Sequence, residues 1–420
     1  MKTNIEQIER DLTDGRNILI TGPAGTGKSH AINHLVKQSN KKFALTASTG
    51  IAATHISGST IHSFCGLTPH TEKSHVVKMI NNTDKGDQIK ERVKQSDVLV
   101  IDEISMLSPE TLELIDEVLK CAADSKLPFG GKQLIMSGDF LQIPPVYNKD
   151  RRSSLTWAFQ SKAWKDANVS TIYTNTVYRQ DNLAFVNALN EIRQGKCSSE
   201  ITEMMENRVG AKLETESKPL KFLPRNNEVD LINAYELNLL IGEEKNYSAR
   251  IYGVSSWHEK QIRDNCIASE RLALKKNAQV IIIKNDPEGR YCNGSLGKII
   301  KFEGGFPVVK IERTGKEELF EYSKWETRGP GGQILASFEQ IPLKLAYALT
   351  IHKSQGMTLD HAEVDPRGIF TEGQLYVALS RVRTLEGLRL LGWHSKYIKA
   401  NKEALNFYGD SLSISKSCDP

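Results

Sequence analysis

The sequence lacks any uninterrupted apolar run close to the ~20 residues that a helix needs to cross a bilayer. Residues 1–14 mix acidic and basic side chains around scattered Ile and Leu. They have neither the apolar core of a signal peptide nor the acid-poor, Arg-rich composition of a transit peptide. These absences argue against a membrane protein and a secreted protein, so we expect an intracellular, cytoplasmic protein with no membrane partner.

Cysteine is also scarce. No two of the six cysteines lie within five positions of each other, which leaves a zinc knuckle or an iron–sulfur cluster without local support. A disulfide framework is not expected in so long a chain with so few cysteines. We expect reduced structural thiols at Cys65, Cys121, Cys197, Cys266, Cys292 and Cys418.

A strong charge of one sign is missing as well. The chain carries 55 Lys and Arg against 51 Asp and Glu, a formal net charge of +4. This balance permits a nucleic-acid partner but is not the basic signature that would indicate one. The 39% hydrophobic and 25% charged content is ordinary for a globular protein, and 420 residues predict two to four domains.

Short apolar runs followed by small or polar residues dominate the first part of the chain. They are Asn17–Thr21, Phe43–Ala47, Val98–Ile101 and Gln133–Ser137. Consecutive rather than alternating apolar residues indicate strands covered on both faces, as in a parallel sheet. Ligands of such sheets bind beyond the carboxyl ends of the strands. We therefore expect a doubly wound α/β domain over residues 1–170.

A second α/β region is expected over residues 171–278 and 342–420. It includes a helix over Glu372–Arg383 and a strand near Leu388–Leu391. Between its two parts, residues 279–341 contain short β-rich runs separated by Asn-Gly and Gly-Gly pairs. Closely spaced short strands with glycine turns predict a small barrel inserted in the second domain.

The segment GPAGTGKS fits the phosphate-binding pattern GxxxxGK[ST] and lies between an apolar strand and a helical stretch. Its glycines let backbone N–H groups turn inward around phosphates, and the helix N-terminus adds favourable partial charge. We expect Lys28 to reach the β- and γ-phosphates of ATP and Ser29 to hold magnesium. The expected loop consists of Gly22, Pro23, Ala24, Gly25, Thr26, Gly27, Lys28 and Ser29.

Polar residues at the ends of two further strands complete the predicted catalytic site. Asp102 and Glu103 directly follow a buried run, where unpaired carboxylates would be costly to desolvate. We expect Asp102 to complete the coordination of magnesium and Glu103 to activate the attacking water. Gln142, in the segment GDFLQIPPV, is either a sensor of the γ-phosphate or a turn residue.

Two arginines of the second region are candidates for contact with the nucleotide. Arg179 lies in VYRQ, and Arg381 follows Gln374 by seven residues, so these last two share a helix face. An arginine supplied across a closing cleft accelerates phosphoryl transfer by about 10³–10⁵-fold. If the second domain does not close over the nucleotide, each arginine is an ordinary surface cation.

Taken together, these motifs resemble the Pif (petite integration frequency) family of superfamily 1B 5′-to-3′ DNA helicases. They occur in the order typical of that family and cover nearly the whole chain. The segments that carry the resemblance are Gly22–Ser29, Thr46–Ala53, Gly58–Phe64, Asp102–Leu107, Pro128–Val146, Val177–Asn182, Leu274–Asn285, Ala346–Asp360 and Tyr376–Arg381.

The resemblance implies two RecA-like domains that share one ATP site. It also implies a wedge insertion within about residues 54–92 and a Src-homology-like barrel over 279–341. The implied activity is ATP hydrolysis, with ATP and magnesium as cofactors, coupled to 5′-to-3′ movement on single-stranded DNA. The implied partners are single-stranded, duplex or forked DNA, bound by a monomer or by a dimer on DNA.

The resemblance further implies ligand contacts at named positions. Gln355 and Gly356 would face the nucleotide, Tyr178 would stack on adenine, and Gln7 would recognise adenine although it lies 15 rather than the usual 17 or so residues before Gly22. Phe64 either stacks on a base or is a core aromatic, and the two histidines are either DNA contacts or structural. The implied DNA contacts are Thr46, Ser48, Thr49, Gly50, His62, Ser63, Phe64, Thr350, His352, Lys353 and Ser354.

Two other classes of function stay open. A nucleotide-switched binding protein would hydrolyse ATP without unwinding DNA. A motor that moves on RNA is also compatible, because nothing in the sequence reads the 2′-hydroxyl. A nuclease is disfavoured because no second acidic cluster accompanies Asp102 and Glu103.

Overall fold

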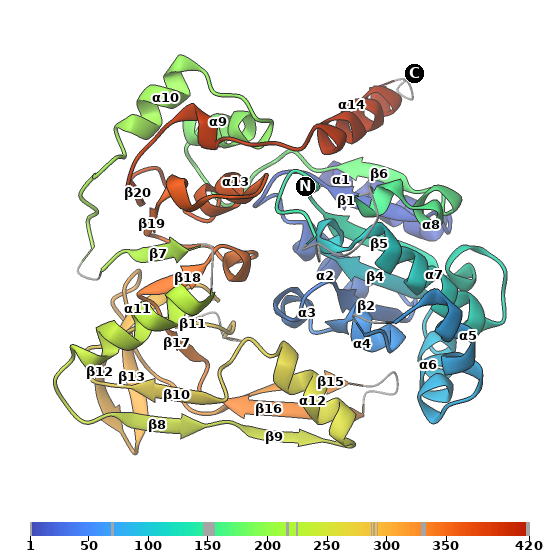
Figure 1. The fold of residues 1–420 in the computed structure, drawn as a ribbon, viewed down its shortest axis with the longest axis horizontal. Helices are drawn as coiled ribbons and strands as arrows, with labels where there is room; N and C mark the ends of the chain where they lie inside the picture. The colour runs from blue at the N-terminus through green and yellow to red at the C-terminus, as the bar shows by residue number, and fades with distance from the viewer. Residues whose placement is uncertain are drawn as a thin grey trace. The chain divides into compact units, whose positions relative to one another are not determined.

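The apolar runs of the first part of the chain form one parallel sheet. Its strands are β1 (Ile18–Thr21), β2 (Phe43–Ala47), β3 (Ser59–Thr60), β4 (Val98–Asp102), β5 (Gln133–Gly138) and β6 (Ser170–Tyr173). Their order is β3-β2-β4-β5-β1-β6, and all neighbours are parallel (Figure 1). Strands β1, β4 and β5 are buried along their whole length, as consecutive apolar residues predict.

This computed structural model describes residues 2–68, 71–145, 156–215, 218–223, 226–286, 288, 290–291, 293–328 and 333–416. The chain divides into two units. The first consists of Met1–Tyr178, Thr327–Leu335 and Lys402–Pro420, and the second of Arg179–Glu326 and Ala336–Asn401. Val146, at the end of one motif, and the cysteines Cys292 and Cys418 lie outside the described residues, whereas Cys65, Cys121, Cys197 and Cys266 are free thiols.

Each face of the first sheet has its own hydrophobic core, because successive side chains of a strand point to opposite faces. Ile18 and Ile20 pack with helices α1 (Lys2–Thr13) and α2 (Lys28–Gln38) on one face. Leu19 belongs to the core on the other face. That second core includes residues of α4 (Ile61–Cys65), α5 (Lys73–Asn81), α6 (Asp84–Lys94), α7 (Pro109–Ala123), α8 (Lys162–Asp166) and α14 (Lys402–Lys416).

Three short 3₁₀ helices and one α-helix complete the first unit. They are α3 (Gly50–His55), η1 (Ile104–Met106), η2 (Pro128–Gly131) and η3 (Ala158–Gln160). The expected wedge segment, residues 54–92, contains β3 and α4–α6. In the structure β3 pairs with β2, while Val76, Ile80 and Ile89 of α5 and α6 enter the core beside α7. This segment is therefore packed onto the first sheet.

A second parallel sheet lies in the second unit. Its strands are β7 (Leu220–Leu223), β18 (Ala348–Thr350), β19 (Ala362–Val364) and β20 (Leu388–Leu390), in the order β18-β7-β19-β20. The helices of this part are α9 (Leu183–Arg193), α10 (Ser199–Glu206), α11 (Asn226–Asn238), α13 (Gln374–Leu379), η4 (His352–Ser354), η5 (Pro366–Gly368) and η6 (Ser395–Tyr397). The predicted pair of parallel α/β units is confirmed.

The remainder of the second unit is rich in antiparallel strands. One sheet has the order β14-β13-β12-β11-β17 and contains β11 (Gln279–Ile282), β12 (Leu296–Glu303), β13 (Phe306–Ile311), β14 (Glu317–Leu319) and β17 (Leu343–Leu345). A second pairs β8 (Lys245–Ser248) with β10 (Arg271–Leu274). A third has the order β15-β16-β9, from β9 (Arg250–Gly253), β15 (Ser323–Arg328) and β16 (Ile334–Gln340), and the end of β15 and the start of β16 fall within Thr327–Leu335 of the first unit. Helix α12 (Ser256–Asn265) lies between β9 and β10 in the chain.

The antiparallel region begins earlier than the sequence predicts. Tyr247 and Leu272, from β8 and β10, share one hydrophobic core with Val280 and Val309 of the five-stranded sheet. Strands upstream of the expected boundary at residue 279 thus bury their side chains together with those of the expected barrel.

The unit boundary also differs from the expected one. Thr171, the expected start of the second domain, lies inside β6, which pairs with β1 through Leu19. At the other end, α14 returns to the first unit, where Ala404 and Tyr408 are buried in its core. Figure 1 shows this red helix beside the blue and green elements of the first unit. None of the helices formed by the described residues combines the length and apolar content needed to span a bilayer.

Candidate active site

The loop between β1 and α2 has the conformation that its glycines allow. Gly22, Gly25 and Gly27 have φ angles of +145°, +80° and +83°, which side chains with a Cβ rarely adopt. A Cβ at Gly22 would also lie 2.0 Å from the carbonyl oxygen of Thr174. Glycine is therefore required at this position by both torsion and space.

Side chains of the loop fix its shape. The Lys28 ammonium donates hydrogen bonds to the carbonyl oxygens of Gly22 and Pro23, both at 2.9 Å. The Thr26 hydroxyl donates to the Pro23 carbonyl at 3.0 Å and lies 2.8 Å from the hydroxyl of Thr174. Lys28 thus holds its positive charge over the loop, at the N-terminus of α2, where anions bind favourably.

A carboxylate from β4 meets the end of this loop. The Ser29 hydroxyl donates to Asp102 at 3.1 Å, the Ser137 hydroxyl donates to the same carboxylate, and the backbone N–H of Glu103 donates to it at 3.0 Å. Asp102 is only 4% exposed. A hydroxyl and a carboxylate side by side offer the oxygen ligands that Mg²⁺ prefers, so Ser29 and Asp102 fit a magnesium ion.

Glu103 lies in a left-handed turn after β4, with φ 54°. Its carbonyl oxygen accepts a hydrogen bond from the Ser48 hydroxyl at 2.7 Å, and the Ser48 N–H donates to the Asp102 carbonyl at 3.0 Å. The segment after β2 is thereby attached to the backbone of Asp102 and Glu103.

Gln142 lies in a turn, which is one of the two interpretations that its sequence context left open. Its backbone N–H donates to the Asp139 carbonyl at 3.0 Å, which closes a turn. Its side-chain amide donates to the Asp139 carboxylate at 3.4 Å, and the N–H of Leu141 donates to that carboxylate at 3.1 Å. Gln142 is therefore a turn residue whose amide is held by a buried acid.

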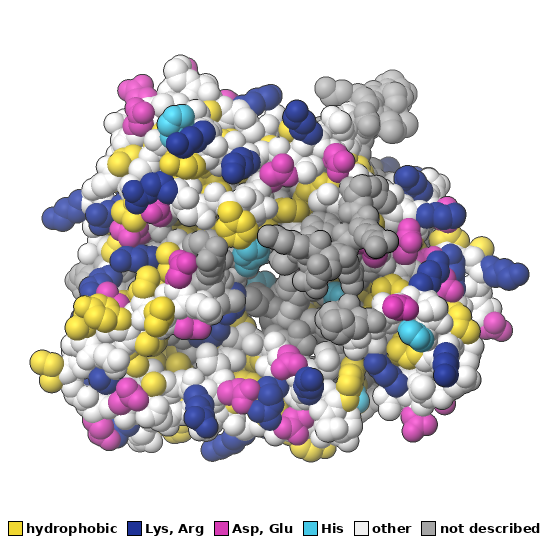
Figure 2. Space-filling model, in the orientation of Figure 1, with side chains coloured by type: hydrophobic (Ala, Val, Ile, Leu, Met, Phe, Trp, Pro, Cys, Tyr) yellow, Lys and Arg dark blue, Asp and Glu magenta, His cyan; other side chains and the backbone are white. Residues whose placement is uncertain are grey.

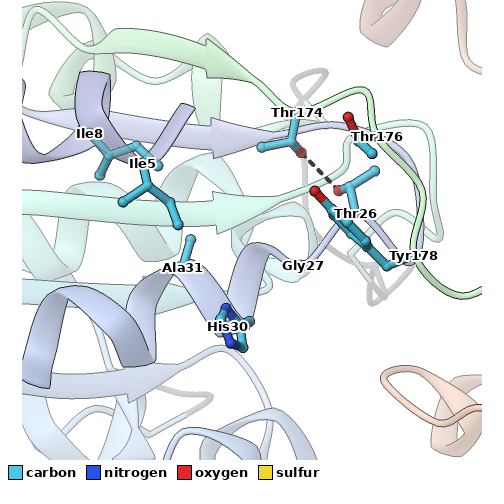
Figure 3. Close-up of a pocket in the computed structure, with 9 residues that line it drawn as sticks. All are labelled: Ile5, Ile8, Thr26, Gly27, His30, Ala31, Thr174, Thr176 and Tyr178. Atoms are coloured by element: carbon cyan, nitrogen blue, oxygen red, sulfur yellow. Dashed lines mark hydrogen bonds between the residues drawn. The ribbon is translucent and has the colours of Figure 1, made fainter. Parts of the chain in front are cut away.

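A pocket beside the phosphate loop is lined mainly by apolar atoms. It lies between α1, the start of α2 and the segment that follows β6 (Figure 3). Tyr178 is 47% exposed, and its backbone N–H donates to the Gly25 carbonyl at 2.8 Å. The lining residues are Ile5, Ile8, Thr26, Gly27, His30, Ala31, Thr174, Thr176 and Tyr178.

Gln7 is exposed and does not line this pocket, whereas Ile5 and Ile8 of the same helix do. Sequence reasoning missed these two residues and also Thr174 and Thr176. The i, i+3 spacing of Ile5 and Ile8 could have identified the inner face of α1. The threonines give no comparable local signal.

The second unit brings its two candidate arginines to one place. Arg179 donates to the Thr358 hydroxyl at 3.0 Å and to the Ser380 carbonyl at 3.1 Å. Arg381, only 2% exposed, donates to the Val377 carbonyl at 3.0 Å and to the Ser380 hydroxyl at 2.8 Å. Both guanidinium groups are therefore fixed around Ser380, although they are far apart in the sequence.

Two glutamines of the second unit have buried amide groups. The Nε2 atoms of Gln355 and Gln374 have no hydrogen-bond partner in the part of the chain that the structure describes. Leaving a buried donor unsatisfied costs about 1–3 kcal/mol, so such an amide is a candidate contact for a ligand. Gly356, the other predicted contact here, has a φ of +79°.

Comparison with known proteins places this chain in a family. The sequence model of the PIF1-like helicase family matches residues 2–203. An ATP-dependent DNA helicase Pif1 from Bdellovibrio bacteriovorus is 33% identical over 398 residues, which are 94% of this chain and 89% of that protein. The chain belongs to the PIF1-like helicase family.

Two further relatives extend this result. An ATP-dependent DNA helicase PIF1 from Xenopus laevis is 36% identical over 97% of this chain, which spans 64% of that protein's length. A solved structure of Pif1 helicase from Bacteroides, in complex with ADP-AlF3 and ssDNA, is 29% identical. The alignment covers 98% of this chain and 96% of that one, with a TM-score of 0.69. The resemblance read from the motifs is confirmed.

The DNA contacts that the PIF1-like resemblance implies for the first unit differ in exposure. The Thr46 side chain is buried and donates to the Val100 carbonyl, and Phe64 is only 7% exposed in the hydrophobic core, with the Arg92 guanidinium 5.7 Å from its ring centre. Both side chains are therefore enclosed by protein in this structure, which favours the core interpretation of Phe64 and leaves its contact with DNA to be tested. Ser63 is also buried, whereas Ser48, Thr49, Gly50 and His62 are partly exposed.

In the second unit, the corresponding residues surround η4. The Thr350 hydroxyl is buried and accepts the Lys353 N–H at 3.3 Å, and the buried Ser354 hydroxyl donates to the Ile351 carbonyl at 2.7 Å. His352 and Lys353 are partly exposed. Burial lowers the pKa of both His62 and His352 from the ordinary value of 6.5, so both imidazoles are neutral near pH 7.

Surface charge does little to locate the predicted DNA contacts. Figure 2 shows Lys and Arg side chains interspersed with Asp and Glu over the face in view, without a broad area of one sign. This mixture agrees with the nearly balanced composition. The DNA contacts must therefore be argued from individual residues.

Proposed function

We propose that this chain is an ATP-driven DNA helicase that moves 5′-to-3′ along single-stranded DNA and unwinds duplex or forked DNA. The observation that carries the proposal is the 3.1 Å hydrogen bond between Ser29, at the end of a glycine-rich phosphate loop, and the buried strand-end carboxylate Asp102. The names of the relatives and the ADP-AlF3 and ssDNA complex of the Bacteroides protein support it.

In this proposal the triphosphate of ATP binds to the loop Gly22–Ser29. Lys28 exchanges its two loop carbonyls for phosphate oxygens, which carry more negative charge and so attract the ammonium more strongly. Ser29 and Asp102 would hold a magnesium ion, which would neutralise phosphate charge during hydrolysis. The base would lie in the apolar pocket, against Tyr178 and beside Ile5 and Ile8.

The remaining residues act on the reacting phosphate. Glu103 follows the magnesium-holding carboxylate directly and would accept the proton of the attacking water. Gln142 would sense the γ-phosphate through the amide that Asp139 positions. Arg179 and Arg381 would stabilise the charge that develops on the phosphoryl group, as the family resemblance implies.

Single-stranded DNA would bind through its backbone. Ser48, Thr49 and His62 of the first unit, and His352 and Lys353 of the second, offer hydroxyl, imidazole and ammonium groups that suit phosphates and do not read bases. ATP hydrolysis supplies the free energy for strand separation, which costs roughly 1.4 kcal/mol of stacking per base-pair step.

Unwinding assays with tailed duplexes test the proposal. A duplex with a 5′ single-stranded tail should be unwound in preference to a matched 3′-tailed duplex, and Lys28→Ala should abolish both ATP turnover and unwinding while leaving a folded protein. Preference for the 3′ tail would contradict the proposed polarity. ATPase activity stimulated by DNA without strand displacement would indicate a nucleotide-switched binding protein, and stronger stimulation by a matched RNA strand would indicate an RNA motor.

A further inference from the structure

The C-terminal helix α14 places one hydroxyl group among the elements of the ATP site. Tyr408 is 5% exposed, and its hydroxyl lies 2.7 Å from the hydroxyl of Thr21. It accepts a hydrogen bond from the N–H of Phe140 at 3.0 Å and lies 3.3 Å from Oδ1 of Asp139, to which it can donate. No motif of the sequence includes Tyr408.

The partners of this hydroxyl belong to two segments of the proposed ATP site, the end of β1 and the turn that carries Gln142. Thr21 is the last residue of β1, directly before the phosphate loop. Asp139 holds the side-chain amide of Gln142. Tyr408 thus connects the start of the phosphate loop to Gln142 through a continuous series of hydrogen bonds.

The network has two ways to distribute its protons. Thr21 can donate to the Gly138 carbonyl at 2.8 Å, and Tyr408 then donates to Thr21. Alternatively Thr21 donates to Tyr408, and Tyr408 then donates to the Asp139 carboxylate. In the second arrangement the Tyr408 hydroxyl donates to the same carboxylate that accepts the Gln142 amide, and so helps to fix the orientation of that carboxylate. Hydrogen bonds to charged groups are stronger than those between neutral groups.

Packing alone does not account for the hydroxyl. The aromatic anchor of α14 is Phe407, which stacks on Phe159 with ring centres 4.4 Å apart and meets Phe140 edge-on at 5.3 Å. Tyr408 packs edge-on against Tyr173 at 6.0 Å, a contact that a phenylalanine would also make. In the simpler interpretation Tyr408 is a core residue whose hydroxyl only has its own hydrogen bonds fulfilled. In the functional interpretation the hydroxyl also positions Asp139 and Gln142.

Helix α14 directly follows the second unit in the chain. Asn401 belongs to the second unit, where its side chain donates to Glu372 at 2.7 Å. The next residue, Lys402, begins α14 in the first unit. Helix α14 therefore begins directly after a residue whose side chain is bonded to the second unit.

We propose that Tyr408 is a positioning residue for ATP hydrolysis, which sets the orientation of Asp139 and thereby that of the Gln142 amide. The proposal rests on the proposed ATPase function. Tyr408 touches no nucleotide in it and acts only through Thr21, Asp139 and Gln142.

Steady-state ATPase kinetics of Tyr408→Phe, measured with saturating single-stranded DNA, test this role. We expect kcat to fall about tenfold, because a hydrogen bond to a charged group is lost, with KM for ATP changed less than twofold. Thr21→Val removes the facing hydroxyl and should act on the same step. The double variant should therefore be no slower than the slower single variant, as expected for residues of one network.

Phe407→Leu is the matched control on the same helix. It should lower the melting temperature by weakening the aromatic packing while leaving kcat within twofold of the wild type. A Tyr408→Phe enzyme with wild-type kcat would overturn the proposal, as would an equal loss of kcat in Phe407→Leu. If Lys28→Ala retained ATP turnover, the proposed function itself would fail, so the two failures can be told apart.

Discussion

The two parallel sheets of this chain have the same kind of architecture but different residues beyond their strands. In the first unit, β1 and β4 end in a glycine-rich loop and a buried carboxylate, which meet at the Ser29–Asp102 hydrogen bond. In the second unit, β18 ends in a 3₁₀ helix that carries His352 and Lys353. The sheet supplies the scaffold in both units, and the residues after its strands decide which ligand can bind.

Basic side chains show the same contrast. The Lys28 ammonium of the first unit bonds to carbonyls of a loop that phosphate can occupy in their place. The arginines of the second unit bond to the backbone and hydroxyl groups around Ser380, within a buried turn. In the proposed function the first unit therefore receives the phosphate directly, whereas the two arginines of the second unit are already held by protein groups.

Replacing Arg381 tests whether the second unit contributes to hydrolysis, and it has the largest expected effect. Arg381→Ala should bind ATP with an affinity within a few-fold of the wild type, while kcat falls by about 10³-fold, as for other arginines that act on a transferred phosphoryl group. Nucleotide binding by fluorescence and single-turnover hydrolysis would measure the two effects. An unchanged kcat with a lowered melting temperature would make Arg381 structural only.

Gly22→Ala tests the geometry of the first unit. The added Cβ would meet the Thr174 carbonyl at 2.0 Å in a backbone conformation that alanine disfavours, so we expect a loss of about 2–5 kcal/mol in unfolding free energy and at least a tenfold weaker ATP affinity. Gly15→Ala is the matched control, since Gly15 also has a positive φ but no atom within 4 Å of the added Cβ. Gly15→Ala should lower the free energy of unfolding by about 1–2 kcal/mol and leave ATP binding unchanged. Equal effects of the two substitutions would mean that the close approach to Thr174 is unimportant.

Phe64→Leu decides between the two interpretations of that aromatic residue. A base stacked on Phe64 would contribute about 1–3 kcal/mol, so its loss would weaken DNA binding roughly 5- to 150-fold. Because Phe64 is buried in the first core, we expect the affinity for single-stranded DNA to change less than threefold and the unfolding free energy to fall by about 1–2 kcal/mol. Fluorescence anisotropy and chemical denaturation measure these quantities. A tenfold weaker affinity with unchanged stability would restore the stacking role.

The smallest expected effect concerns the two neighbours in η4. Lys353→Gln should reduce the slope of log Kd against log salt by about 0.7, the value for one phosphate contact on a single strand. His352→Asn should leave the slope unchanged near pH 7.5, because burial lowers the pKa of His352 and keeps its imidazole neutral. Salt titrations of DNA binding at that pH would show the difference. Equal slopes for both variants and the wild type would remove Lys353 from the DNA contacts.

The sequence predicts those parts of the molecule that depend on local patterns. Strands β1, β4 and β5 are buried on both faces, and their consecutive apolar residues therefore identify them. The phosphate loop is predictable for the same reason, since its glycines and Lys28 lie next to each other in the chain. Asp102 was found because it ends a buried strand.

Other features depend on contacts between distant segments, and local patterns do not show them. Strands β8 (KNYS) and β9 (RIYG) are only four residues long, so their pairing with distant strands has no clear periodic signal. Nothing in residues 402–416 indicates which core the helix joins, so the role of Tyr408 could not be anticipated. Motif position predicts ligand contacts for Thr46 and Gln7, but the Thr46 side chain is buried and Gln7 is exposed outside the pocket.

The chain leaves the first unit alongside the loop expected to bind phosphate. The backbone N–H of Thr174 donates to Thr21 at 2.7 Å, and that of Tyr178 donates to Gly25 at 2.8 Å, one residue before the second unit begins. Both bonds join main-chain atoms, so they do not depend on which side chains occupy these positions. Among the ordinary amino acids only proline would remove a donor. Substitution of side chains along residues 174–178 would therefore leave this segment joined to residues 21–25 by the same two bonds.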